Sequence, residues 1–133
     1  MIDLIKIIGA GAVALAVIGA VVIGGQDTTY FVPPPEAVAE SFTRAVAARR
    51  YDRAVAHVDP RSGLTEINAR LGGEALHERA GSIETVEGDP GVIAGDNATA
   101  SAVLITEKAG RVRYFFKLTR TGYLWKISEW SDR

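Results

Sequence analysis

An uninterrupted apolar segment, Leu4 to Gly25, constrains this 133-residue chain more than any other feature. Its only charged residue is Lys6, and no polar side chain occurs from Ile7 to Gly25. A helix of about 20 apolar residues spans a hydrocarbon core of about 30 Å and pairs its backbone polar groups within lipid. We therefore predict a transmembrane anchor over residues 1–25. A signal peptide cut near Gly24 is the alternative, although its apolar region is usually about 7–15 residues long.

Within this segment, Gly9 to Ala14 fits the G-x-G-x-x-A pattern of a dinucleotide-binding turn. Asp27 also lies near the distance at which such a site carries the acid that holds the ribose. The helix of a nucleotide-binding unit needs a polar face toward water, however, and the residues after Gly11 offer none. Strands alternating with helices do not follow either. We therefore expect no cofactor.

The charges that flank the segment predict its orientation. Lys6 precedes it, and Arg44 is the first basic residue after it, which places the N-terminus in the cytoplasm. The C-terminal part would then be extracytoplasmic, or periplasmic, and held at the cell membrane. Small residues recur at a spacing of four and would let another membrane helix approach closely, or they recur by chance in an Ala/Gly-rich span. These residues are Ala12, Ala16, Ala20 and Gly24.

The composition excludes several classes of function. Fifteen Lys and Arg residues nearly balance sixteen Asp and Glu residues, so the chain lacks the basic field that nucleic-acid binding requires. Because there is no cysteine, the chain has no thiolate metal site and no cysteine nucleophile. His57 and His77 have no further ligands at a suitable spacing, so we expect no metal site.

A spacer over residues 26–35 separates the anchor from the rest of the chain, and Pro33–Pro35 stiffens it. The helical spacing of apolar residues then predicts one helix over residues 36–50 and a short one over residues 51–58. Pro60 ends the second helix, because the residue before a proline is disfavoured in the helical region.

A third helix is expected from Leu64 onward, with Ile67 and Leu71 on the same apolar face and an interruption at Gly72-Gly73. From residue 82 the apolar period changes to two, with residues 88–95 as a turn-rich link. The predicted strands cover residues 82–87, 97–106, 111–119 and 123–130. Residues 36–133 should therefore form a cone-shaped α+β domain, in which three helices pack on a bent antiparallel sheet of about four strands.

Three segments of this domain resemble the nuclear transport factor two-like (NTF2-like), or cystatin-like, superfamily. They are PPEAVAESFTRAVAARRYDRAVAHV (Pro34–Val58), GDNATASAVLI (Gly95–Ile105) and GYLWKISEW (Gly122–Trp130). Within the superfamily, the chain looks most like small bacterial extracytoplasmic domains of unknown function that are tethered to the membrane. The resemblance implies a long first helix across a bent sheet and a pocket between sheet and helices. Some members are isomerases or dehydratases and others bind ligands or partners, so the fold does not fix the function.

Catalysis in such a pocket would need an inward-facing acid or histidine with a shifted pKa. The inward faces of the predicted strands 97–106 and 111–119 hold no Asp or Glu, and Glu129 lies at the end of its strand. His57 and Asp59, at the end of the second helix, remain as catalytic candidates, and a structural role at that helix end is the alternative for both.

A basic row lies on the wet face of one predicted strand and consists of Arg111, Arg113 and Lys117. Trp130 would extend it. The row is either a solvated strand face or a docking surface for an acidic partner or lipid headgroups.

We therefore expect a non-enzymatic, single-pass accessory or scaffold subunit of a larger membrane complex. Its partners would be the bilayer and other membrane protein subunits. The alternatives are a tethered binder of small apolar ligands in the cone pocket, and an isomerase- or dehydratase-like enzyme that uses His57 or Asp59.

Overall fold

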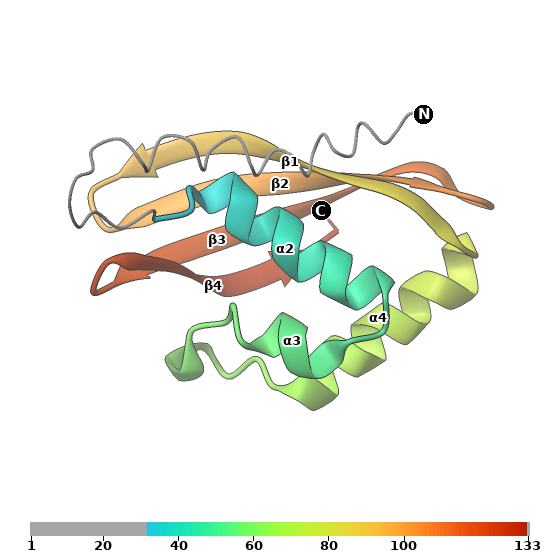
Figure 1. The fold of residues 1–133 in the computed structure, drawn as a ribbon, viewed down its shortest axis with the longest axis horizontal. Coiled ribbons are helices and arrows are strands. Elements are labelled where there is room, and N and C mark those ends of the chain that lie inside the picture. Colours follow the sequence, from blue (N-terminus) through green and yellow to red (C-terminus); the bar gives the residue numbers. More distant parts are fainter. Residues whose placement is uncertain (1–31, 133) are drawn as a thin grey trace, which may run out of the picture. The chain divides into compact units, whose positions relative to one another are not determined.

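The computed structural model describes residues 32–132, and its compact domain begins at Pro34. Four strands form one antiparallel sheet in the order β1-β2-β3-β4, and the helices cover one face of it (Figure 1). The elements are α2 (Pro35–Ala47), α3 (Tyr51–Val55), the 3-10 helix η1 (Pro60–Ser62), α4 (Glu66–Ala80), β1 (Ile83–Ala94), β2 (Asn97–Thr106), β3 (Gly110–Thr121) and β4 (Leu124–Ser131). The predicted α+β architecture is confirmed.

The predicted anchor, residues 1–25, and its small-residue stripe lie outside the described residues. Within residues 32–132, no helix is both long and apolar enough to cross a membrane. The anchor therefore stays a prediction from the sequence.

Helix α2 begins with Pro35, whose fixed φ suits the first helical position, and carries Glu36 in its first turn. It ends three residues before the predicted Arg50, because Arg49 takes a left-handed conformation with φ of 61°. The amide of Arg50 donates to the carbonyl of Ala45, and that of Arg49 to the carbonyl of Val46. These two bonds form a Schellman motif that turns the chain directly into α3.

Helix α4 runs without a break through Gly72 and Gly73, where the sequence suggested an interruption. Thr65 caps its N-terminus in a reciprocal capping box with Asn68. The two glycines are sites of close approach: a β-carbon at Gly72 would lie 2.8 Å from the Trp130 ring. The helix accepts two glycines because they let it pack directly on aromatic rings.

The buried face of α4 also differs from the expected one. Ile67 and Leu71 are exposed, whereas Ala69, Gly73 and Leu76 are buried. Apart from Leu76, the residues of this face are small, which lets α4 lie close to its neighbours. The apolar residues do recur at helical spacing, but they form an exposed stripe on the helix.

Strand β1 is longer than predicted and continues through Pro90, because the strand is at the edge of the sheet. Proline lacks an amide hydrogen and is tolerated at an edge or a bulge, and the register shifts between Pro90 and Ile93. Side chains of α2 satisfy the outer edge of β1. Arg44 donates to the carbonyl of Val86 at 3.0 Å, and Glu40 accepts from the amide of Gly88 at 3.0 Å.

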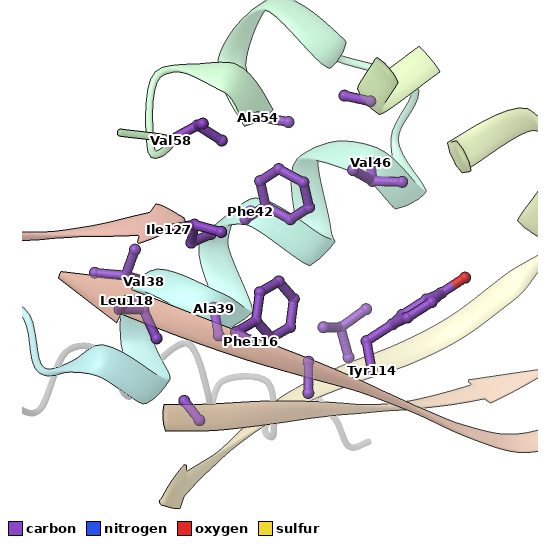
Figure 2. Packing of buried hydrophobic residues seen from close by; sticks show 14 of the residues in the cluster. Val38, Ala39, Phe42, Val46, Ala54, Val58, Tyr114, Phe116, Leu118 and Ile127 are labelled. Atoms are coloured by element: carbon purple, nitrogen blue, oxygen red, sulfur yellow. The ribbon is translucent and has the colours of Figure 1, made fainter. Parts of the chain in front are cut away.

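The core fills the space between the helices and the sheet. Figure 2 shows Phe42 of α2 pointing into this space near Phe116 and Ile127. The Phe42 ring contacts Phe116 and Trp130 edge to face, with centroids 5.7 and 5.0 Å apart. Tyr114 also packs edge to face on Trp130, with centroids 5.5 Å apart. Large aromatic rings therefore occupy the space where the resemblance implies a pocket.

Candidate functional site

The segment that carries both catalytic candidates is built into the edge of the sheet. Val58 forms a parallel bridge with Ile127 of β4. The amide of Asp59 donates to the carbonyl of Ile127, and the amide of Ile127 donates to the carbonyl of His57, both at 2.8 Å. The backbone of residues 57–59 therefore acts as a very short fifth strand.

The carboxylate of Asp59 is 4% exposed and is surrounded by donors. It accepts the backbone amide of Arg61 at 2.9 Å, the Arg61 guanidinium at 2.9 and 3.1 Å, and the Thr119 hydroxyl at 3.0 Å. These hydrogen bonds, mainly those from Arg61, hold the pKa of Asp59 well below its usual range. A carboxylate held in this way is a weak base, and it joins η1 to β3.

His57 is half-buried, and burial lowers the pKa of its imidazole, with the nearby Lys126 ammonium lowering it further. The Lys126 ammonium donates to the carbonyl of Ala56 at 2.9 Å. His57 is therefore neutral at pH 7. The hydrogen bonds of Asp59 go to Arg61 and Thr119, so the two catalytic candidates do not form an acid–base pair.

Two buried polar atoms have no hydrogen-bond partner among residues 32–132: the Tyr51 hydroxyl and the Trp130 Nε1. Both side chains lie against the glycines of α4. Burial raises the pKa of Tyr51, with Glu74 acting in the same direction, so its hydroxyl remains protonated. The seam beneath α4 therefore holds two unused hydrogen-bond donors.

The outer face of the sheet carries the predicted basic row. Arg113 donates to Asp89 of β1 at 3.1 Å and to Ser101 of β2 at 2.9 Å. Lys117 pairs with Glu129 of β4 at 3.5 Å. Arg111 is exposed next to these groups on β3. The three cations share one face, but two of them already form ion pairs within the domain.

Phe115 lies on this face between Arg113 and Lys117 and is 45% exposed. Its cross-strand neighbours are Ser101 of β2 and Ser131 of β4, and neither serine is large enough to cover the ring. Trp130 lies on the opposite face, because its ring packs on Phe42 and Tyr114 in the core. The prediction that Trp130 extends the basic row is therefore wrong, and the aromatic residue beside the row is Phe115.

Among solved structures, the chain is similar to a protein from Campylobacter jejuni named as an NTF2-like transpeptidase. The TM-score is 0.59 with 13% identity, over 71% of this chain and 97% of that one. The fold is NTF2-like. A SEC-C motif containing protein from Rhodopseudomonas palustris is also similar, with a TM-score of 0.56 and 19% identity over 75% of this chain and 79% of that one. At these identities the likeness shows the fold alone. No protein-family model and no curated protein matches the chain.

The NTF2-like domain contains no cluster of three or more potential metal-ligating side chains among its described residues. From the sequence, Trp130 was named as the aromatic residue of this surface and Phe115 was missed. Its signal was available, since Phe115 is the one large apolar residue among polar ones on that side of the strand. The structure adds that serines flank it across both neighbouring strands.

Proposed function

We propose that this protein is a single-pass accessory or scaffold subunit of a membrane complex, whose extracytoplasmic NTF2-like domain docks on another protein. The predicted anchor over residues 1–25 supports membrane attachment, and the basic flank at Lys6 supports a cytoplasmic N-terminus. The docking part of the proposal rests on a single observation. Phe115 is exposed at the centre of the outer sheet face, among Arg111, Arg113 and Lys117.

This surface has the composition of a protein interface. Aromatic residues and arginines dominate the binding energy of many complexes, typically where an apolar centre is ringed by polar groups. The ion pairs of Arg113 and Lys117 are partly exposed and contribute about 0–1 kcal/mol each, so a carboxylate of a partner can replace them at little cost. We infer a partner surface that is acidic around an apolar socket.

The packing of the domain interior also supports a non-catalytic role. Aromatic side chains fill the space between helices and sheet, and the Asp59 carboxylate is occupied by Arg61 and Thr119. Neither observation supplies a base poised beside a substrate cavity.

The test is extraction of the full chain in mild detergent, followed by native mass spectrometry of what copurifies. The native chain should retain a second subunit, and Phe115→Ser should lose it. Leu71→Ser removes an apolar side chain from α4 that is more exposed than Phe115, at 63% against 45%, and should retain the subunit. A native chain that is monomeric at all concentrations would contradict the proposal, as would equal loss from both variants.

A tethered ligand binder is the second candidate, favoured by the unpaired donors of Tyr51 and Trp130 beneath α4. A ligand with a carbonyl or carboxylate oxygen could accept from one of these donors if α4 moved outward. Native mass spectrometry of the same preparation would then show a bound small molecule, and Tyr51→Phe would weaken its retention. Ligand-free protein in every preparation would exclude this candidate.

A further inference from the structure

One end of the sheet carries four exposed apolar side chains from two separate hairpins. Val92 and Ile93 lie near the end of β1, Tyr123 lies in the β3–β4 turn, and Leu124 begins β4. Their exposed fractions are 67%, 59%, 77% and 46%, respectively. We call these four residues the hairpin-tip surface.

Arg120 joins the two hairpins into one surface. Its backbone amide donates to the carbonyl of Asp96 at 2.8 Å, and its guanidinium donates to the carbonyl of Gly95 at 3.2 Å. Its guanidinium also stacks over the Trp125 ring at 4.8 Å, which fixes its position. The hydrogen bonds of Arg120 therefore hold the two hairpin tips together, so both tips can contact one partner at the same time.

A groove of about 290 Å³ lies behind the tips. Val92, Ala98 and Leu118 give it an apolar lining, and Lys117 stands among the lining residues. An apolar chain with an anionic head would match this arrangement. The turn at the other end of the sheet, Glu107 to Ala109, offers no comparable apolar side chain.

The course of the chain indicates what this end faces. Helix α2 starts toward the end of the sheet that carries these two turns (Figure 1), and the carbonyl oxygen of Glu36 lies against Gly88 of β1. The spacer before α2, residues 26–35, spans about 30 Å as a polyproline helix and at most about 36 Å when fully extended. An anchor that ends at residue 25 therefore keeps this end of the domain near the bilayer and at high effective concentration there.

We propose that the hairpin-tip surface docks on the lipid bilayer, so that the NTF2-like domain rests on the membrane by its β1–β2 and β3–β4 turns. Tyrosine and aliphatic side chains on protruding turns suit the headgroup–acyl boundary, where an aromatic ring with a polar end is favoured. This inference rests on the membrane anchor of the proposed function. It leaves the outer sheet face, with Phe115, open to a protein partner.

The experiment uses the full chain, which contains no cysteine and so accepts single labelling sites. Tyr123→Cys, Leu71→Cys and Lys108→Cys each receive an environment-sensitive fluorophore. The labelled chains are reconstituted into phosphatidylcholine–phosphatidylglycerol vesicles that contain nitroxide-bearing lipids. Position 71 is the matched control, because Leu71 is 63% exposed but lies on α4. Position 108 reports the opposite end of the sheet.

Docking predicts at least twofold stronger quenching by lipid at position 123 than at positions 71 and 108. A second variant with Val92→Ser and Leu124→Ser should lose this difference, whereas Ile67→Ser with Leu71→Ser should keep it. Equal quenching at all sites in chains that resist alkaline washing would overturn the docking alone. Chains that wash off the vesicles would overturn the anchor as well. Shielding of position 123 from aqueous iodide without quenching by lipid would identify a protein contact and also overturn the proposal.

Discussion

The ring of Tyr51 occupies the space that a side chain on Gly73 would need, since a β-carbon there would lie 2.6 Å from Tyr51 Cε1. Replacing a glycine by alanine inside a helix ordinarily stabilises it by about 0.5–1 kcal/mol. Gly73→Ala should instead lower the free energy of unfolding by about 1–2 kcal/mol, because overpacking forces the ring or the helix to move. Urea unfolding measures this change. Glu78→Ala, on the exposed side of α4, should change the stability by no more than about 0.5 kcal/mol, and an increase for Gly73→Ala would contradict the packing.

The left-handed Arg49 offers a stabilising change. A side chain at positive φ carries a steric cost that glycine does not, and the Schellman motif needs only the backbone of this residue. Arg49→Gly should raise the free energy of unfolding by about 0.5–1 kcal/mol. Arg50→Gly places the same residue type at a φ of −101°, where it should destabilise. Thermal unfolding of both variants decides the matter, and a lower midpoint for Arg49→Gly would be inconsistent with this geometry.

The lowered pKa of Asp59 predicts a loss of stability in acid. Above about pH 5 the carboxylate is ionised in both the folded and the unfolded state, so its hydrogen bonds contribute fully. As the pH falls below the unfolded value of about 3.9, the unfolded chain binds a proton that the native Asp59 resists. The contribution disappears only when the pH falls through the native pKa.

Asp59→Asn should therefore flatten the dependence of unfolding free energy on pH between about pH 4 and pH 2 by close to one proton. Urea titrations at a series of pH values give this slope. Asp52→Asn changes an exposed carboxyl on α3 and serves as the control. An unchanged slope for Asp59→Asn would show that the contacts with Arg61 and Thr119 do not form in solution.

The lowered pKa of His57 predicts a second pH range in which the stability changes. Burial lowers its native pKa, so below about pH 6.5 the unfolded chain binds a proton that the native imidazole does not. The stability should fall as the pH decreases from about 7 and should level off below the native pKa. His57→Gln should remove this part of the slope, whereas His77→Gln should leave it in place. A slope that survives His57→Gln would show that it arises from other groups and would contradict this prediction.

Much of the fold followed from apolar periodicity. The apolar face of α2 and the alternation of β3 follow from the sequence, because one side of each element is buried and the other is wet, whereas β2 also buries Ser101 and Val103 on its outer side. The prediction for α4 was wrong for a physical reason. Apart from Leu76, its buried stripe consists of small residues, which carry little hydrophobic signal, and the larger Ile67 and Leu71 drew the assignment to the exposed side.

The site was less predictable than the fold. That Asp59 would be bound by Thr119 could not be inferred, because the two residues are 60 positions apart and meet only when residues 57–59 pair with β4. Trp130 was assigned to the wet side because it lies near the chain terminus. The bulge in β4 opposite Lys117 and Leu118 changes the alternation there, and such register shifts are not visible in the pattern of residue types.

Both margins of the sheet are blocked at their middle, by Val58 next to Ile127 on one side and by Glu40 and Arg44 over Val86 and Gly88 on the other. These contacts oppose extension of the sheet by main-chain pairing across the middle of either edge, the mode of recognition that tolerates almost any sequence. Recognition by this domain then depends chiefly on its side chains. Its choice of partner can then change through single substitutions while the scaffold beneath them stays the same.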